Sequence, residues 1–307
     1  MFVLKQVMVA LDLTEMDDTL IRYAAYISQQ SAIEKVFFIH TEKSLDMPDE
    51  LMSGLSRQQT STELTIRDSI LKKVQTYFSD LPQVEVVVFV VQGTPVKEIL
   101  NLSKQEQVNL LIAGRKLHLR GSGVLPQKLL RSGKVSVLFV PENNKPKLNK
   151  AVVAIDFSEY SLMALDRMLI TAMHRPGMEV ECLHVYEVPT GYITLGESYE
   201  SFDKKMQGFA KQKFDQVLAR YPELAGRAFL RLVKQEHNDD LGEVIVLEAK
   251  RSEADLLVVG AKGKSAIALF IVGSVAEQVL HHNNDIPLLV FRNEKEEVGF
   301  LDALLDT

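Results

Sequence analysis

The amino-acid sequence repeats itself once over most of its length. Three segments recur in the same order at offsets of 144 to 146 residues: VALDLTE at 9–15 as VAIDFSE at 153–159, FIH at 38–40 as CLH at 182–184, and NLLIAG at 109–114 as DLLVVG at 255–260. A period of this length indicates a duplicated domain and not a solenoid of short repeats. The 307 residues also suit two domains of ordinary size.

The boundary between the two copies is expected in the segment PENNKPK at 141–147, which is polar and contains two prolines. Such composition is typical of linkers between domains. We therefore predict one domain over residues 1–145 and a second over 148–307.

Each half alternates short apolar segments rich in Val and Ile with longer amphipathic ones. The apolar segments are expected to be strands: 3–11, 35–40, 84–91, 108–113 and 135–140 in the first half, and 150–155, 179–186, 227–234, 255–259 and 287–291 in the second. Alternating strands and helices predict an α/β fold, here two tandem doubly wound domains, each with a five-stranded parallel sheet.

Ligands of such sheets bind at the carboxyl ends of the strands, near the point where the strand order reverses. Asp156 follows the first strand of the second half, and Ser158 is the expected N-cap of the next helix. One face of that helix should be buried, because its apolar residues recur at helical spacing: Leu162, Leu165, Met168, Leu169 and Ala172.

A glycine-rich segment follows the strand at 255–259. Gly260 and Gly263 are followed by Gly273 and Ser274, which gives the pattern G-x2-G-x9-G-S. Glycine allows a backbone to approach a phosphate closely and to adopt a positive φ. Gly273 and Ser274 are expected at the start of a helix, where free N–H groups and the helix dipole favour an anion. The Ser274 hydroxyl can donate to a phosphate and cap the helix.

Two lysines, Lys262 and Lys264, add positive charge to this loop. The loop is not a P-loop, because the required first glycine is replaced by Val258. The segment GSG at 121–123 does not begin a dinucleotide fingerprint either, because Pro126 stands where the third glycine is needed.

The chain resembles the ATP-binding universal stress proteins in three features: Asp156, the pair His184-Val185 and the glycine pattern. The resemblance covers the chain as two copies. It implies the fold of that family, which is similar to that of the adenine-nucleotide alpha hydrolases. It also implies that ATP, AMP or ADP is bound, with Mg²⁺ or Mn²⁺. Asp156 would contact the ribose, the Val185 backbone the adenine, and Gly260 the ribose and phosphates. The phosphates would be held by Gly263, Gly273, Ser274 and the Val275 amide.

The first half departs from this pattern. Asp12 and Gly114 remain, but Leu117 replaces the second glycine, and Gly123-Val124 stands opposite Gly273-Ser274, so the hydroxyl is lost. The loop from Gly114 is also four residues shorter, which should prevent it from surrounding a triphosphate in the same way. We expect a nucleotide only in the second half; the basic residues after Gly114 are expected to be solvated or to hold another anion.

Simpler roles stay open for several polar residues. Asp12 and Asp156 can serve as helix-entry residues. His40 and His184 are expected to be hydrogen-bonded core residues, and His281-His282 a surface pair. Asp239, Asp240 and the acidic segment 294–297 are expected to be solvated, and the amphipathic tail 298–307 to dock or fray. We predict no catalytic residue and no metal site formed by side chains alone.

Charge and composition narrow the function further. The net charge of −6 argues against a nucleic-acid binder. The single cysteine, Cys182, excludes an internal disulfide and fits a reducing compartment. The sequence has no leader pattern and no apolar run of membrane length, so we expect a cytoplasmic protein without a membrane partner.

The expected function is nucleotide-dependent regulation of the stress response through an unidentified protein partner. Such a protein would be at most a slow ATPase. A nucleotide-independent scaffold, a carrier of another small ligand and an ATP-using transferase remain alternatives.

The resemblance also implies an assembly. Domains of this family commonly dimerise through their last strands, so a tandem chain can pair 136–140 with 287–291 internally as a pseudo-dimer; a homodimer of whole chains stays an alternative.

This pairing predicts the behaviour of the separated halves. An apolar last strand without a partner leaves an open edge that invites association, so residues 1–145 or 148–307 expressed alone should dimerise or aggregate. Sedimentation velocity measures this, and two monomeric, soluble halves would refute the pairing.

Overall fold

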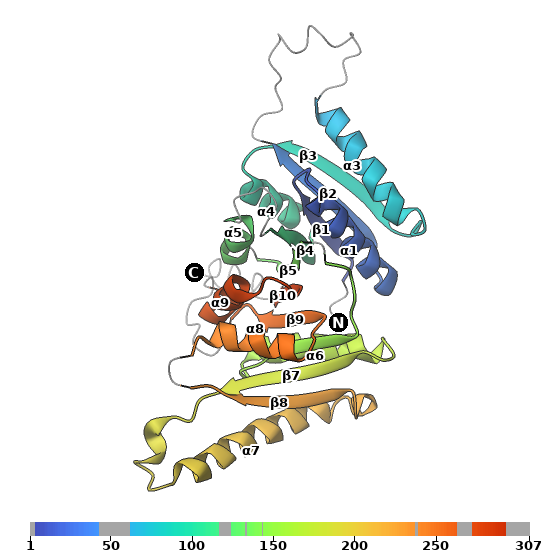
Figure 1. Ribbon diagram of the computed structural model, residues 1–307. Coiled ribbons are helices and arrows are strands. Elements are labelled where there is room, and N and C mark those ends of the chain that lie inside the picture. Colours follow the sequence, from blue (N-terminus) through green and yellow to red (C-terminus); the bar gives the residue numbers. More distant parts are fainter. Residues whose placement is uncertain are drawn as a thin grey trace, which may run out of the picture. The chain divides into compact units, whose positions relative to one another are not determined.

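A computed structural model describes residues 4–42, 62–116, 124–132, 134–142, 144–236, 239–262 and 272–292 of the chain. The chain forms two compact units, Met1–Pro146 (unit 1) and Lys147–Thr307 (unit 2) (Figure 1).

In its described residues, unit 1 alternates strands and helices along the chain. The elements are β1 (Gln6–Leu11), α1 (Met16–Gln30), β2 (Lys35–Glu42), α3 (Thr62–Phe78), β3 (Glu85–Gln92), α4 (Pro95–Gln105), β4 (Leu110–Arg115), α5 (Val124–Ser132) and β5 (Ser136–Pro141).

Unit 2 repeats this order, and its described residues also form two short 3₁₀ helices. Its elements are β6 (Lys150–Ala154), α6 (Glu159–Met173), β7 (Glu179–Tyr186), η1 (Thr190–Tyr192), α7 (Tyr199–Leu218), η2 (Pro222–Leu224), β8 (Ala228–Lys234), α8 (Leu241–Arg251), β9 (Leu256–Gly260), α9 (Ser274–His282) and β10 (Leu288–Phe291).

The two units share one strand order. It is β3-β2-β1-β4-β5 in unit 1 and β8-β7-β6-β9-β10 in unit 2, and the strand pairs within each unit are parallel. The predicted doubly wound α/β fold is therefore confirmed, with strands at the ten predicted places. The first strand begins only at Gln6, since the preceding Leu4 and Lys5 lie outside it.

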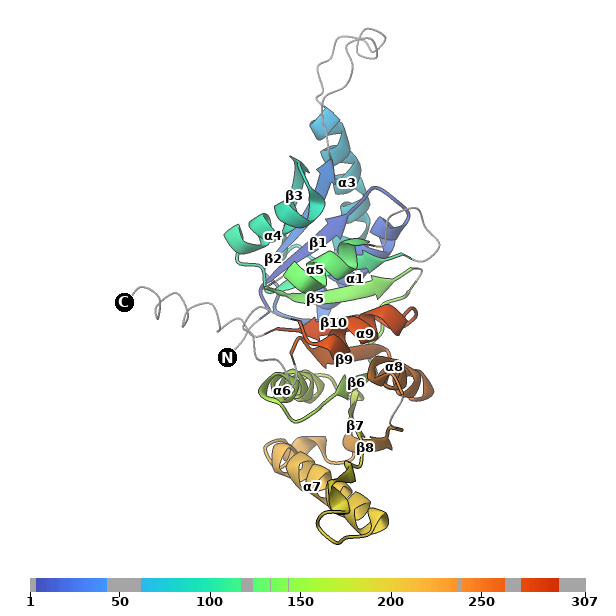
Figure 2. The same ribbon diagram turned by 90° about the vertical axis from the view of Figure 1, so that its left-hand side faces the viewer.

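Helices cover both faces of each sheet, as Figure 2 shows for α6 on one side of unit 2 and α8 with α9 on the other. The predicted apolar face of α6 is confirmed: Leu165, Leu169 and Ala172 are fully buried. They pack against Cys182 of β7 in the core of unit 2. Burial raises the pKa of the Cys182 thiol well above its ordinary value, as expected for an inert core cysteine.

The duplication extends to unusual backbone conformations. Leu13 and Phe157, which follow the two repeated aspartates, have φ of 59° and 60°. A second matched pair, Gln107 and Glu253, has φ of 50° and 52°. Left-handed conformations are unfavourable for residues with a Cβ, and most of all for bulky ones. Their recurrence at matched positions shows that each fold needs a sharp reversal there, including the one directly after its first strand.

The cores differ on the sheet face that α4 covers in unit 1 and α8 covers in unit 2. In unit 1 the rings of Phe37 and Phe89 stack there with centroids 5.9 Å apart. The repeat offset matches Phe37 with Glu181, and strand register matches Phe89 with Arg231. Unit 2 thus has an ion pair, 3.5 Å between Arg231 Nη1 and Glu181 Oε1, where unit 1 has two phenylalanines.

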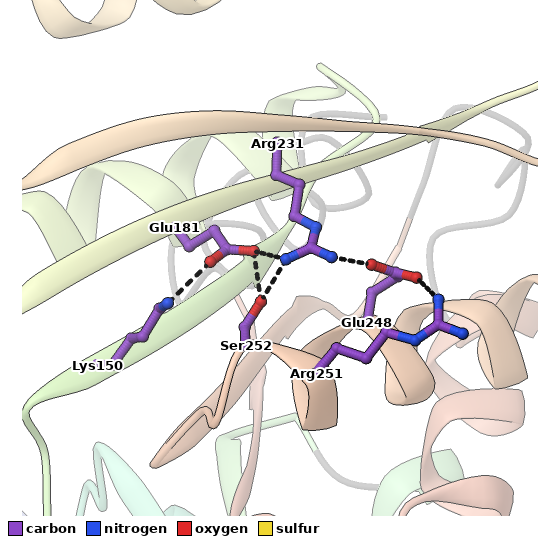
Figure 3. Close-up of polar contacts among 6 residues, drawn as sticks. All are labelled: Lys150, Glu181, Arg231, Glu248, Arg251 and Ser252. Atoms are coloured by element: carbon purple, nitrogen blue, oxygen red, sulfur yellow. Dashed lines mark hydrogen bonds and ion pairs between the residues drawn. The ribbon is translucent and has the colours of Figure 1, made fainter.

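Glu181 is the centre of a buried polar network, shown in Figure 3. Its carboxylate lies 3.1 Å from Lys150 Nζ and accepts a 2.7 Å hydrogen bond from Ser252. Arg231 continues the network to Glu248, which also pairs with Arg251. Because both carboxylates are nearly fully buried, they depend on these cations for the hydration they have lost.

Glu181→Gln should therefore destabilise unit 2 while leaving the sheet intact. We expect a loss of about 2–3 kcal/mol in unfolding free energy, below the ~3–5 typical of a broken buried pair because both cations are partly exposed. Urea denaturation measures it. The matched control is Glu179→Gln, at an exposed position two residues earlier on β7, with an expected change under about 0.5 kcal/mol. Equal effects of the two variants would show that the network contributes nothing.

Candidate functional site

The loop after β6 is held by its own polar side chains. Asp156 Oδ1 accepts hydrogen bonds from the Ser158 backbone N–H, at 2.9 Å, and from the Ser158 hydroxyl. The Asp156 backbone N–H donates to the hydroxyl of Ser161 in the first turn of α6. Ser158 is the N-cap residue of α6, as predicted, but its hydroxyl serves Asp156 and not the helix. The loop thus fixes the half-buried Asp156 at the carboxyl end of the sheet.

Gly260, at the end of β9, lies directly against this loop and helix. A Cβ on Gly260 would be 3.2 Å from Ser161 N, Tyr160 C and Tyr160 Cβ. Gly260 therefore allows β9 to approach the start of α6 closely. Positive φ is not the reason for the glycine: neither Gly260 nor Gly273 is among the described glycines with positive φ.

Helix α9 begins beside Gly260. Gly273 N donates to Ala261 O at 2.8 Å, which ties the start of the helix to the end of β9. Gly273 itself is the N-cap residue, with φ −65° and ψ 141°, and Ser274 is the first helical residue. The predicted capping role of Ser274 is therefore wrong, because Ser274 lies one position after the N-cap residue. The amides of Ser274 and Val275 belong to the first turn, where N–H groups have no acceptor within the helix.

Val185 lies close to the same region because the preceding residue, His184, contacts the segment directly after β6. His184 Nδ1 lies 2.8 Å from the carbonyl oxygen of Ile155, which directly precedes Asp156. The His184 ring also contacts the Phe157 ring edge-on, with centroids 4.9 Å apart. The structure thus bears out the expected hydrogen-bonded histidine, and the half-buried Val185 follows it on β7.

Two cations, buried Lys262 and half-buried Arg292, lie at the carboxyl ends of β9 and β10. Burial, reinforced by the charge of Arg292, lowers the pKa of Lys262. Burial alone lowers the pKa of Arg292 to about 10. Lys262 is only 8% exposed; its ammonium lies over the Tyr160 ring and donates to the Tyr160 hydroxyl at 3.2 Å. The lowered pKa values mean that burial makes the charged form less favourable here than in water.

The corresponding place in unit 1 is arranged differently. Asp12 pairs with Lys116, the counterpart of Lys262, and also accepts a 2.6 Å hydrogen bond from Thr14. Unit 1 has Asp17 where unit 2 has Ser161, and Asp17 Oδ1 accepts from the Asp12 backbone N–H. Asp17 is fully buried, its Oδ2 has no hydrogen-bond partner, and desolvation raises its pKa.

Some predicted positions lie outside the described residues. These are Gly263 and Lys264, Leu117 to Gly123 in unit 1, and the acidic segment and tail from 294. Among the described residues, no three His, Cys, Asp or Glu side chains are grouped so as to hold a metal ion. No described helix combines the length and apolarity that a membrane crossing requires.

One predicted solvated carboxylate has a structural role. Asp240 is the N-cap residue of α8, and its side chain accepts a 3.0 Å hydrogen bond from the Glu243 N–H. It also lies 3.5 Å from His282, one of the two histidines expected at the surface. The expectation for Asp240 was wrong because its helix begins one residue after it, so the carboxylate meets the free N–H groups of the first turn.

Comparison with known proteins gives one family twice. The family model described as "Universal stress protein family" matches residues 4–141 and again 147–292. A universal stress protein of Methanocaldococcus jannaschii is 26% identical over 156 residues, which is 50% of this chain and 88% of that protein. A Staphylococcus saprophyticus protein named for the same family is 32% identical over 100 residues. That match spans 32% of this chain and only 59% of the relative's length.

Solved structures with the same fold extend over nearly the whole chain. A universal stress protein from Archaeoglobus fulgidus superposes with a TM-score of 0.62 at 17% identity, covering 95% of this chain and 97% of that one. A Pseudomonas aeruginosa protein named for the family gives a TM-score of 0.67 at 13% identity, with 99% and 98% covered. Identities this low establish a shared fold alone.

Buried Asp17 predicts an unusual pH dependence for unit 1. A carboxyl whose pKa is raised on folding stabilises the fold only while protonated. Its contribution is complete below the unfolded pKa of about 3.9 and is lost as the pH rises through the folded pKa. Asp17→Asn, which stays neutral, should therefore increase protection of the β1 amides from hydrogen exchange at pH 7. The gain should shrink as the pH falls toward 4.

The neighbouring Asp18 provides a control of opposite sign. A hydrogen bond from Tyr77, together with Arg22, lowers the pKa of Asp18. Asp18→Asn should therefore reduce protection at pH 7, and the loss should disappear as the pH falls through the folded pKa. An Asp17→Asn variant that is less protected than the wild type at pH 7 would contradict the assignment.

Proposed function

Because the chain belongs to the universal stress protein family, we propose that it is a regulatory protein of the stress response that binds an adenine nucleotide in unit 2. The nucleotide state would change the conformation or the choice of a protein partner. The main support is that three features lie together at the carboxyl ends of β6 and β9: the Asp156 loop, the closely packed Gly260 and the N-terminus of α9.

The chemistry of these groups suits the two ends of a nucleotide. The amides of Ser274 and Val275, the α9 dipole and the buried charges of Lys262 and Arg292 favour a phosphate. Asp156, anchored by Ser158, is suited to accept hydrogen bonds from ribose hydroxyls. The Val185 backbone would contact the adenine, and Gly260 the ribose and phosphates. Gly263 and Gly273 complete the proposed set in the phosphate loop.

A divalent ion would belong to this proposal as a companion of the phosphates. Mg²⁺ is commonly held by substrate phosphates with one or two protein ligands, so the Ser274 hydroxyl is the group suited to it or to Mn²⁺. The ion would neutralise phosphate charge. No residue is assigned a catalytic role, so hydrolysis would be slow if it occurs.

We further propose a cytoplasmic protein whose halves pair internally, on the sequence grounds given above.

The proposal predicts one ATP per chain. Isothermal titration of the full chain with ATP and Mg²⁺ should give a stoichiometry near one. A nucleotide-independent scaffold would give no heat and no thermal stabilisation, and a transferase would show turnover only with a second substrate. Two equivalent sites would contradict the assignment to unit 2.

Variants of unit 2 separate the contributions. Gly273→Val should abolish binding by adding bulk at the helix start, and Ser274→Ala should weaken it by about 1–3 kcal/mol through loss of a donor to a charged acceptor. Asp156→Ala should weaken nucleoside recognition and retain phosphate binding. Gly123→Val in unit 1 is the matched control and should leave the affinity unchanged. Binding that survives Gly273→Val and fails with Gly123→Val would place the site in the other unit.

A further inference from the structure

One lysine position in the duplicated fold has two different partners. Lys116 and Lys262 each stand two residues after the repeated glycine, Gly114 or Gly260, and both are about nine-tenths buried. In unit 1 the Lys116 ammonium pairs with the repeated aspartate, Asp12. In unit 2 the Lys262 ammonium donates to Tyr160. The side chains near the two lysines differ between the units, and one of them offers a reason for the different partners.

One neighbour that differs and touches the lysine in unit 2 is the residue four positions after the aspartate. It is Met16 in unit 1 and Tyr160 in unit 2, at the repeat offset of 144. Both lie against the repeated glycine: a Cβ on Gly114 would be 2.7 Å from Met16 Cγ, and one on Gly260 would be 3.2 Å from Tyr160 Cβ. The two residues therefore stand at matching places in the first turn of the first helix of each unit, against the end of the strand that precedes the lysine.

Met16 and Tyr160 differ in the interactions that they can make with a lysine ammonium. The Met16 thioether is a weak acceptor, so the Lys116 ammonium gains most from Asp12. Tyr160 offers a ring face, 5.1 Å from Lys262 Nζ to the centroid, and a hydroxyl acceptor at 3.2 Å. A cation–π contact and a hydrogen bond together hold a buried ammonium without using a carboxylate.

We propose that Tyr160 is a positioning residue of the nucleotide site: it holds Lys262 away from Asp156, so that the aspartate serves the ribose and the lysine serves the phosphates. Unit 1, with Met16, has its lysine on the aspartate, and this contributes to its loss of the nucleotide. The inference rests on the proposed function for its ligand, but the contact between Tyr160 and Lys262 is independent of that ligand.

Exchange of the two residues tests this. In Tyr160→Met, Lys262 should move onto Asp156 as Lys116 does onto Asp12, and ATP affinity in titration calorimetry with Mg²⁺ should fall about three- to tenfold. Tyr160→Phe keeps the ring and loses the hydroxyl, so its loss should be smaller. Met16→Tyr in unit 1 is the matched control, and it should leave the affinity for ATP unchanged.

A double-mutant cycle separates positioning from simple packing. If Tyr160 acts through the lysine, Tyr160→Met should have no further effect on affinity in a Lys262→Met background. An equal loss in both backgrounds would overturn the inference, because it would mean that the tyrosine only supports the fold.

A readout without nucleotide keeps the two proposals distinct. The Asp156 carboxyl, followed by ¹³C NMR in the ligand-free full chain, should titrate at lower pH in Tyr160→Met than in the wild type, because a new cation favours the carboxylate. Failure of the wild type to bind ATP would refute the proposed function alone. Unchanged titration of Asp156 in a folded Tyr160→Met protein would refute the role of Tyr160.

Discussion

The close contact between Gly260 and the first turn of α6 determines the geometry of the candidate site. With no side chain at Gly260, the end of β9 lies against Tyr160 and Ser161. This brings together two features that are about a hundred residues apart in the sequence, the Asp156 loop and the start of α9. The Gly273 N–H, bonded to Ala261 O, then fixes the direction of α9 and its first-turn amides. A larger residue at Gly260 would separate the aspartate from the helix dipole.

The two units show how a duplicated fold can keep its architecture and change its chemistry. Strand order, parallel pairing and the left-handed residues after the first strand are common to both. The side chains above this framework have diverged. A phenylalanine stack in unit 1 corresponds to an ion pair in unit 2, and a serine beside the aspartate loop of unit 2 corresponds to a buried carboxylate in unit 1. The first change preserves the sheet because it lies on one face, which a helix covers, and the second lies in the first turn of a helix and not in the sheet.

Fold and repeat were predictable from the sequence because they depend on patterns that are visible in it. Apolar runs of strand length, a constant offset and glycines after strands gave the α/β class, the strand positions and the surroundings of Asp156. The wrong details concern single residues at helix starts. Ser274 was expected to cap α9, but the N-cap residue is Gly273, one position earlier. Asp240 was expected to be solvated, but it is the N-cap residue of α8, which begins one position later.

Several interactions that the sequence did not suggest are between side chains from distant segments. Tyr160 carries no distinguishing signal in the sequence, because a tyrosine in a helix is ordinary; only its contact with Lys262 gives it a role. Alignment of the two halves would have revealed a signal, because Tyr160 stands opposite Met16 while the lysines are retained. The same comparison would have shown the exchange of Phe37 for Glu181, but not which cations satisfy the carboxylate.

The central claim is that the nucleotide lies in unit 2, with its base near Val185 and its phosphates at α9. Photo-crosslinking of the full chain with an ATP analogue that carries the reactive group on the adenine, followed by peptide mass spectrometry, tests it most directly. The account predicts labelled peptides from the region of Asp156 to Tyr186, and protection of these peptides by excess ATP. Labelling confined to unit 1, or labelling that excess ATP does not reduce, would contradict it.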